Sequence, residues 1–175
     1  MLKDIESPDD ASFEPSLRGL AEKGMNLVIG IGFSQKEALE RVALQYPKVK
    51  FALVDAQVTA PNVANLMFAE HEGSYLVGYL AGLASQSHTV GFIGGMDIPL
   101  IHRFQLGFEE GLKAADPNAK LLVNYAGITS DAWANPGRGK ELALGQIAKG
   151  ADVIFHAAGA TWLGVFDAVE EKQKI

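Results

Sequence analysis

The stretch from Thr89 to Phe104, which reads TVGFIGGMDIPLIHRF, constrains the fold of this chain more than any other. Its apolar run at 90–93 predicts a short buried strand, and the glycines that follow predict a tight turn. Apolar residues with helical spacing continue from Pro99 onward. In an open parallel sheet, such a junction lies at the carboxyl end of a strand, where helix N–H groups point toward a ligand. We therefore expect Gly94 and Gly95 to form one wall of a binding cleft.

Strand and helix patterns alternate along the whole chain. Short apolar runs predict strands at 26–31, 50–54, 63–68, 90–94, 120–124 and 153–156. Amphipathic stripes with capping residues predict helices at 14–23, 35–46, 70–85, 99–115, 136–149 and 161–172. Gly73, Gly78 and Gly82 predict that the helix at 70–85 packs closely against another backbone. The alternation is typical of βαβ units, so the predicted fold class is α/β with parallel sheets.

The predicted strands are too few to cover the helices around them. Three strand patterns precede Thr89, three follow it, and no strand follows the last helix. We therefore expect an internal fragment with a partial first α/β lobe at 1–86 and a partial second α/β lobe at 87–175. The alternative is one compact domain of about five or six strands. Such a domain would unfold in one cooperative transition and have a monomeric mass.

The composition excludes several classes of function. The chain has 175 residues, a net charge of -6 and a pI near 5.2, and its 15 basic residues are scattered, which argues against binding to nucleic acid. It contains no cysteine, so disulfides, thiolate metal sites and cysteine nucleophiles are excluded. No apolar stretch reaches the roughly 20 residues that a membrane span needs.

No catalytic motif is present. The chain lacks a phosphate loop, a nucleophile elbow and a pair of histidines at helical spacing. Gly30 and Gly32 are not followed by a glycine at position 35, so they predict a tight strand exit and not a dinucleotide site. The four histidines lie in separate segments, and we expect no metal, no cofactor and no catalytic residue. His156, at the end of a strand, either contacts a ligand or bonds to neighbouring backbone.

Two side chains are candidate ligand contacts on the sequence pattern. Asp55 ends a buried strand, where a carboxylate accepts hydrogen bonds from hydroxyl or amine groups; otherwise it caps a turn. Trp133 lies in a polar loop, SDAWANP. It either stacks on a flat heterocycle or anchors the loop by packing on the domain. Asp97 is expected to cap the following helix, Arg103 to be a solvated or interdomain charge, and Phe104 to support the site.

Several segments together resemble one known family. They are LVIGIGF at 27–33, EGSYLVGYLAG at 72–82, VGFIGGMDIPLIHRFQLGFEEG at 90–111, NYAG at 124–127, NPGRGKELA at 135–143 and GADVIFHAAG at 150–159. With them the chain resembles the basic-membrane-protein family of substrate-binding lipoproteins of ABC transporters, whose best-understood type is a purine nucleoside receptor. The resemblance runs from about Phe13 to the end of the chain.

The resemblance implies the type I periplasmic-binding-protein fold, in which two α/β lobes joined by hinge strands enclose the ligand. The lobe crossover would fall near residues 85–89. Asp55 would match the first-lobe carboxylate that holds the ligand, and Trp133 the second-lobe aromatic that stacks on the base. The remaining residues expected to line the cleft are Gly32, Phe33, Gly94, Gly95, Gly159 and Trp162.

The implied function is that of a solute-binding component of an ABC transporter, which captures a purine nucleoside or similar small ligand and passes it to the permease. The full-length protein would be an extracytoplasmic, membrane-anchored lipoprotein, although this chain carries no signal peptide or anchoring cysteine. Half of the family's pocket is not matched, so we expect weak or no nucleoside affinity for this chain. Unpaired sheet edges would allow self-association. The alternatives are a ligand-sensing domain of the same fold in a regulator and a nucleoside-processing enzyme.

Overall fold

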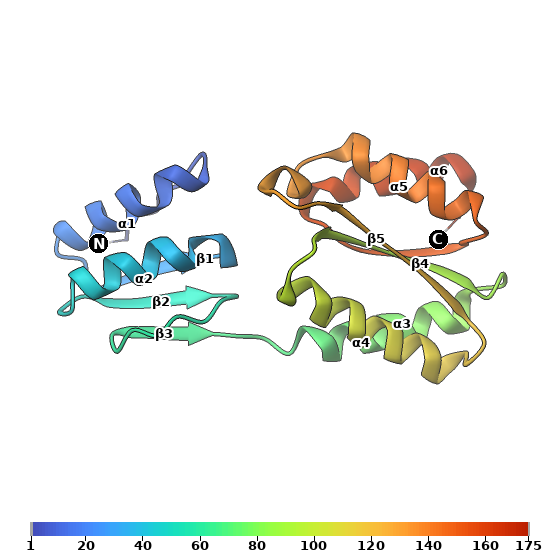
Figure 1. Ribbon diagram of the computed structural model, residues 1–175, viewed down its shortest axis with the longest axis horizontal. Coiled ribbons are helices and arrows are strands. Elements are labelled where there is room, and N and C mark those ends of the chain that lie inside the picture. The colour runs from blue at the N-terminus through green and yellow to red at the C-terminus, as the bar shows by residue number, and fades with distance from the viewer. Residues whose placement is uncertain (1, 175) are drawn as a thin grey trace. The chain divides into compact units, whose positions relative to one another are not determined.

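The computed structural model describes residues 2–174, which form two compact units that divide between Phe68 and Ala69. Each unit combines helices with a parallel sheet of three strands, and Figure 1 shows the elements of each. The predicted α/β class with two parallel sheets is therefore confirmed. No helix within the described residues is both long enough and apolar enough to cross a membrane.

The first unit builds one core between its helices and its sheet. Its elements are the 3-10 helix η1 (Asp10–Ser12), α1 (Phe13–Glu22), β1 (Leu27–Ile31), the 3-10 helix η2 (Phe33–Gln35), α2 (Lys36–Gln45), β2 (Lys50–Val54) and β3 (Val63–Leu66). The sheet has the order β1-β2-β3, and its strands are parallel. Leu17 of α1, Leu39 of α2 and Phe51 of β2 are buried together in the core.

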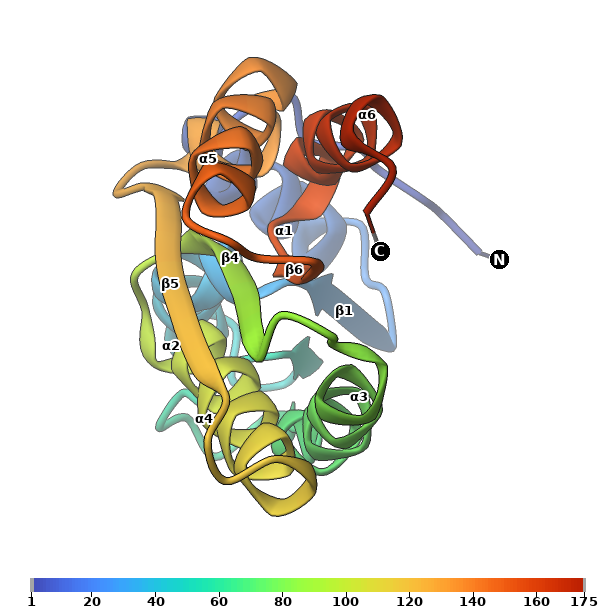
Figure 2. The same cartoon turned by 90° about the vertical axis from the view of Figure 1, so that its right-hand side faces the viewer.

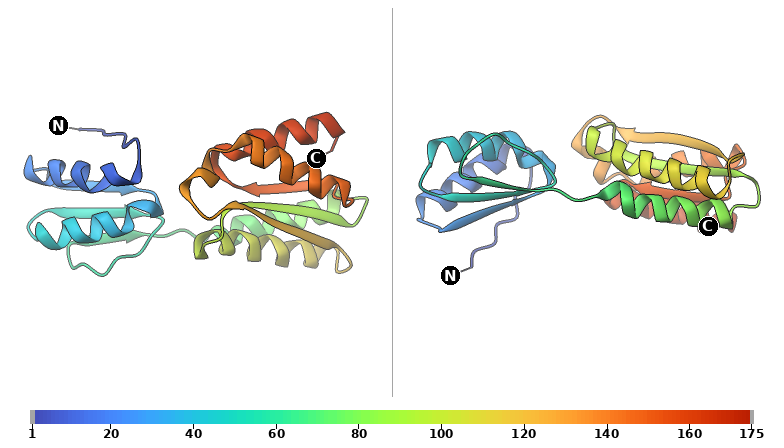
Figure 3. Two further views of the ribbon diagram at one scale, coloured as in Figure 1. Left: turned by 45° about the horizontal axis from the view of Figure 1, so that its top comes forward. Right: turned by 90° about the horizontal axis from the view of Figure 1, so that it is seen from below.

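The second unit has three layers. Its elements are α3 (Glu70–Ala84), β4 (Thr89–Met96), α4 (Pro99–Ala115), β5 (Lys120–Gly127), the 3-10 helix η3 (Ser130–Trp133), α5 (Pro136–Ala148), β6 (Val153–Ala157), the 3-10 helix η4 (Gly159–Thr161) and α6 (Trp162–Lys172). The parallel sheet has the order β5-β4-β6. Figure 2 and Figure 3 show α3 and α4 on one face of this sheet and α5 and α6 on the other. Phe92 and Phe108 lie in the apolar cluster of the first face, and Ile93 and Val165 in that of the second.

Helix α3 packs closely on α4, as its glycines predicted. A Cβ atom at Gly78 of α3 would lie 2.0 Å from the carbonyl oxygen of Phe108. One at Gly111 of α4 would lie 1.9 Å from the carbonyl oxygen of Tyr75. Gly73, by contrast, has no neighbouring atom within 4 Å. Close approach at the first turn of α3 depends instead on Gly107 of α4, where a Cβ atom would lie 2.2 Å from the carbonyl oxygen of His71.

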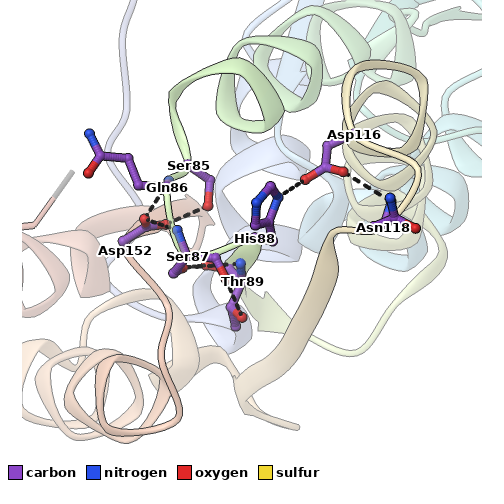
Figure 4. A network of polar contacts seen from close by, with 8 residues as sticks. All are labelled: Ser85, Gln86, Ser87, His88, Thr89, Asp116, Asn118 and Asp152. Carbon is purple, nitrogen blue, oxygen red and sulfur yellow. Dashed lines mark hydrogen bonds and ion pairs between the residues drawn. The ribbon is translucent and has the colours of Figure 1, made fainter.

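The segment at 85–89, where the resemblance places the lobe crossover, is held inside the second unit (Figure 4). The carboxylate of Asp152, just before β6, accepts a hydrogen bond from Ser85 Oγ at 2.6 Å. It also accepts hydrogen bonds from the backbone N–H groups of Gln86 at 2.7 Å and Ser87 at 2.8 Å. These bonds tie the loop between α3 and β4 to the start of β6.

The predicted boundary between the lobes therefore differs from the division of the structure. The prediction placed residues 1–86 in the first lobe and 87–175 in the second. In the structure the chain leaves the first unit after Phe68, and α3 belongs with α4 in the second unit. The two divisions differ in where they place helix α3. An apolar stripe in the sequence shows that a helix is packed, but it does not show which helix it packs against.

Candidate ligand-binding site

The carboxyl ends of β4, β5 and β6 lie at one edge of the second sheet. β4 and β5 extend to Met96 and Gly127, beyond the predicted ends at 94 and 124, and these two residues pair at the end of the ladder. Gly94 of β4 pairs with Ala157 of β6. Because the strands are parallel, the loops that follow them open at the same edge, where open α/β sheets bind ligands. Two of these loops form the 3-10 helices η3 and η4.

Trp133, the last residue of η3, packs across this edge and is partly exposed. Its indole lies over Gly95, where a Cβ atom would be 2.2 Å from Trp133 Cζ3. At Gly159, which has a φ of 52°, a Cβ atom would lie 2.9 Å from the carbonyl oxygen of Trp133. The structure thus brings together Gly95, Trp133 and Gly159. Trp133 packs on the core of its unit, which is the anchoring role; its stacking on a ligand stays a prediction.

Gly94 is buried and lies beneath the sheet edge. A Cβ atom at Gly94 would lie 2.7 Å from the ring of Tyr125 and 2.8 Å from the side chain of Ile101. Tyr125 also links β5 to α4, since its hydroxyl donates a hydrogen bond to Gln105 Oε1 at 2.5 Å. Burial raises the pKa of the Tyr125 hydroxyl, and the carboxylate of Asp97 raises it further.

An aromatic cluster surrounds the predicted site residue Trp162 at the start of α6. The ring of His156 stacks on that of Trp162, with centroids 6.2 Å apart and an interplanar angle of 18°. Phe166 meets Trp162 edge-on, with centroids 4.8 Å apart. Burial lowers the pKa of His156. His156 therefore supports Trp162 by aromatic contact, and a ligand contact of His156 stays a prediction.

The first unit places Gly32 and Asp55 side by side at the carboxyl edge of its own sheet. Ile31 of β1 pairs with Val54 of β2, so Gly32 and Asp55 both directly follow paired residues. Gly32 has a φ of 105° and Asp55 a φ of 67°. The left-handed backbone at Asp55 is uncommon for a residue other than glycine, and such conformations gather at functional sites.

Two further contacts complete this edge of the first unit. The N–H of Asp55 donates a hydrogen bond to the carbonyl oxygen of Leu66 at 3.0 Å, where the pairing of β2 and β3 ends. Phe33 is partly buried and packs on the core of the unit. The structure therefore gathers Gly32, Phe33 and Asp55 at one sheet edge, and their contact with a ligand stays a prediction.

Two of the charged residues near the start of α4 have different partners from those expected. Asp97 does not cap the helix, whose N-cap residue is Ile98; its Oδ1 lies 2.5 Å from His102 Nε2. Arg103 forms an ion pair with Glu70 of α3 at 2.9 Å, inside the second unit. The hydrogen bond from Arg103 lowers the pKa of Glu70. The first contact is local, between residues five apart at the start of α4, whereas the second joins residues that are close only after α3 packs on α4.

The role of one residue at this edge was missed on the sequence, although the residue lies in the segment 159–162 that was expected to line the cleft. Thr161 is completely buried and its hydroxyl bonds to two backbone groups of the segment that carries Trp133. A single threonine in a loop has no sequence pattern of its own, so only the structure shows its partners. Within residues 2–174, no three histidine or carboxylate side chains gather closely enough to hold a metal ion.

Sequence comparison matches this chain to one family model and to several named proteins. Residues 1–175 match the family model Bmp, described as ABC transporter substrate-binding protein PnrA-like. The chain is 39% identical over 171 residues to a CD4+ T-cell-stimulating antigen of Listeria monocytogenes, an alignment that covers 97% of this chain and 47% of that protein. It is 34% identical over 163 residues to the ABC transporter nucleoside-binding protein BmpA of Lactococcus lactis, which covers 93% of this chain and 45% of that protein.

Solved structures agree with these relatives. A solute-binding protein of an ABC transporter system from Aeropyrum pernix K1 is similar with a TM-score of 0.83 and 31% identity, over 95% of this chain and 48% of that chain. The type I periplasmic-binding-protein fold is thereby confirmed. The chain spans about half the length of the relatives it matches. From the match over its whole length, the chain belongs to the family of PnrA-like ABC transporter substrate-binding proteins.

Proposed function

We propose that this protein captures a purine nucleoside or a similar small ligand for an ABC transporter. The observation that carries the proposal is the position of Trp133 at the carboxyl edge of the second sheet. Its indole lies on Gly95, and its backbone runs beside Gly159. An aromatic ring held at this edge is suited to stack on a flat heterocycle. The similar protein of Lactococcus lactis is named a nucleoside-binding protein, which supports this ligand class.

The predicted site residues would divide the work of binding. Trp133 would stack on the base, and the Asp55 carboxylate would accept hydrogen bonds from the base edge or the sugar. The other residues proposed to line the cleft are Gly32, Phe33, Gly94, Gly95, Gly159 and Trp162. None of these residues needs to act as an acid, a base or a nucleophile, so the proposal is binding without catalysis.

Capture would end in transfer to the permease of the transporter. A ligand that contacts both lobes favours the closed population, and the closed form would be the one that the permease accepts. The full-length protein would work outside the cytoplasm as a membrane-anchored lipoprotein. The family match favours this function over the ligand-sensing domain of a regulator and over an enzyme.

Native mass spectrometry of the protein isolated from its natural host tests the ligand class directly. We expect a mass excess equal to one nucleoside, and a released compound with the ultraviolet absorption of a purine. Release of a free sugar or an amino acid would contradict the proposal. Conversion of added inosine or adenosine to base and ribose would instead indicate an enzyme.

Calorimetric titration of the 175-residue chain with adenosine, guanosine and inosine tests the stacking role of Trp133. We expect weak binding, with a dissociation constant above about 1 μM. Trp133→Phe keeps an aromatic face and should bind within about twofold of the unaltered chain, whereas Trp133→Leu should bind about tenfold more weakly. Equal affinities of the Leu and Phe variants would show that the ring does not stack on the ligand.

A further inference from the structure

A single buried side chain links the two 3-10 helices at the carboxyl edge of the second sheet. Thr161, the last residue of η4, is 0% exposed. Its hydroxyl donates a hydrogen bond to the carbonyl oxygen of Ala132 at 2.8 Å and accepts one from the N–H of Asn135 at 2.8 Å. These two backbone groups stand on either side of Trp133. One hydroxyl therefore holds the segment that carries the indole at both of its ends.

The residues around Thr161 restrict its movement. A Cβ atom at Gly139 of α5 would lie 2.2 Å from the carbonyl oxygen of Thr161, so the helix and η4 are in close contact. Asn135, which donates to Thr161, also caps α5, since its Oδ1 accepts a hydrogen bond from the N–H of Arg138 at 3.0 Å. The hydroxyl is thus attached to the first turn of α5 and not to a free loop.

We propose that Thr161 is a positioning residue that sets the orientation of Trp133. Gly95 provides the surface beneath the indole. The paired hydrogen bonds of Thr161 fix the backbone before and after Trp133 and so select one placement of the ring. The effect on a ligand rests on the proposed function, whereas the effect on the indole does not.

The two hydrogen bonds of the Thr161 hydroxyl can be tested with a matched set of variants. The site needs a donor toward Ala132 and an acceptor toward Asn135, and a hydroxyl provides both strongly from one atom. Thr161→Val keeps the shape but leaves the buried carbonyl of Ala132 unpaired. Thr161→Ser keeps the hydroxyl and loses only a methyl group. Thr129→Val is the control, because Thr129 is exposed and its side chain makes no capping hydrogen bond to η3.

Fluorescence of Trp133 in the full chain tests the proposal without a ligand. The chain has two tryptophans, so Trp162→Phe is introduced first and leaves Trp133 as the only indole. We expect Thr161→Val to shift the emission maximum and to raise acrylamide quenching about twofold or more, with Thr161→Ser and Thr129→Val like the parent. The amide of Asn135 should exchange about tenfold faster in Thr161→Val, as expected for the loss of one hydrogen bond.

Identical emission, quenching and Asn135 exchange in Thr161→Val and the parent would overturn the proposal. If Thr161→Val does not fold, Thr161→Cys, with its weaker donor and acceptor, is measured by the same spectra and decides in the same way. Titration with adenosine is the second arm, in which Thr161→Val should bind about two- to tenfold more weakly than Thr161→Ser. Weak or no nucleoside affinity is expected for this chain, so absence of adenosine binding to the parent leaves the decision on Thr161 to the spectra and the proposed function to the protein from the natural host.

Discussion

Replacing Gly95 by alanine should displace the Trp133 ring and destabilise the second unit. The added Cβ atom would lie 2.2 Å from Cζ3 and 2.5 Å from Cε3 of the indole. Carbon atoms attract best at about 3.5–4.0 Å, so the ring must move by well over an ångström. Overpacking of this kind destabilises proteins by about 1–3 kcal/mol. For a unit of about 100 residues, each kcal/mol lowers the unfolding midpoint by about 4 °C or more.

Scanning calorimetry and near-ultraviolet circular dichroism of Gly95→Ala should report both effects. The midpoint should fall, and the tryptophan bands should change because the indole has moved. Gly145→Ala is the matched control: Gly145 lies on the exposed side of α5 with no atom within 4 Å of an added Cβ. Alanine should stabilise that helix by about 0.5–1 kcal/mol.

A double-mutant cycle with Trp133→Ala decides whether the indole is the cause. If the ring is what the new Cβ strikes, Gly95→Ala should be nearly neutral in the Trp133→Ala background, with a coupling energy of at least about 1 kcal/mol. An equal penalty in both backgrounds would refute the reasoning, because the strain would then come from the strand itself.

Two further predictions concern the second unit away from this edge. The hydrogen bond with Asp116 raises the pKa of His88 and lowers that of Asp116. The pair therefore stabilises fully between about pH 4 and about pH 6.5, and the effect is lost as pH rises through the raised pKa of His88 or falls through the lowered pKa of Asp116. The unaltered chain should have a higher unfolding midpoint than His88→Asn, in which asparagine tolerates the φ of 54°. This difference in midpoint should shrink from about pH 6 to about pH 9, and a constant difference would contradict the stabilising pair. Gly111→Ala places a Cβ atom 1.9 Å from the carbonyl oxygen of Tyr75 and should destabilise the chain by about 3 kcal/mol or more. Gly73→Ala is the control and should change the stability by less than about 1 kcal/mol. Equal unfolding midpoints of the two variants would refute close packing of the helices.

The secondary structure could be predicted because its causes are local. The branched run LVIGI at 27–31 is a strand, and the Pro136 and Gly150 signals enclose α5 as predicted. Strand ends were less accurate: β4 continues to Met96 because Met96 finds a partner in Gly127. That pairing joins residues far apart in the chain, and no local pattern contains it.

Charged side chains show the same limit in the candidate site. Asp97 has the position of a helix cap, yet it pairs with His102. Arg103 pairs with Glu70 because α3 packs on α4. A motif lists the partners that a residue could take, whereas the folded structure selects one of them, locally for Asp97 and through helix packing for Arg103. For this reason the types of residue at the site could be predicted, but their contacts could not.

The sequence by itself determined the α/β class, the two parallel sheets and the family, and it singled out Asp55, Gly95 and Trp133 as candidate site residues. Periodicity, glycine positions and family motifs are patterns among residues close in the chain, so they can be recognised without the folded structure. Only the tertiary structure decided that α3 belongs to the second unit, that the indole of Trp133 lies on Gly95, and that Thr161 holds the segment around Trp133. These three facts depend on atoms brought together from distant segments, where close packing leaves room for one arrangement.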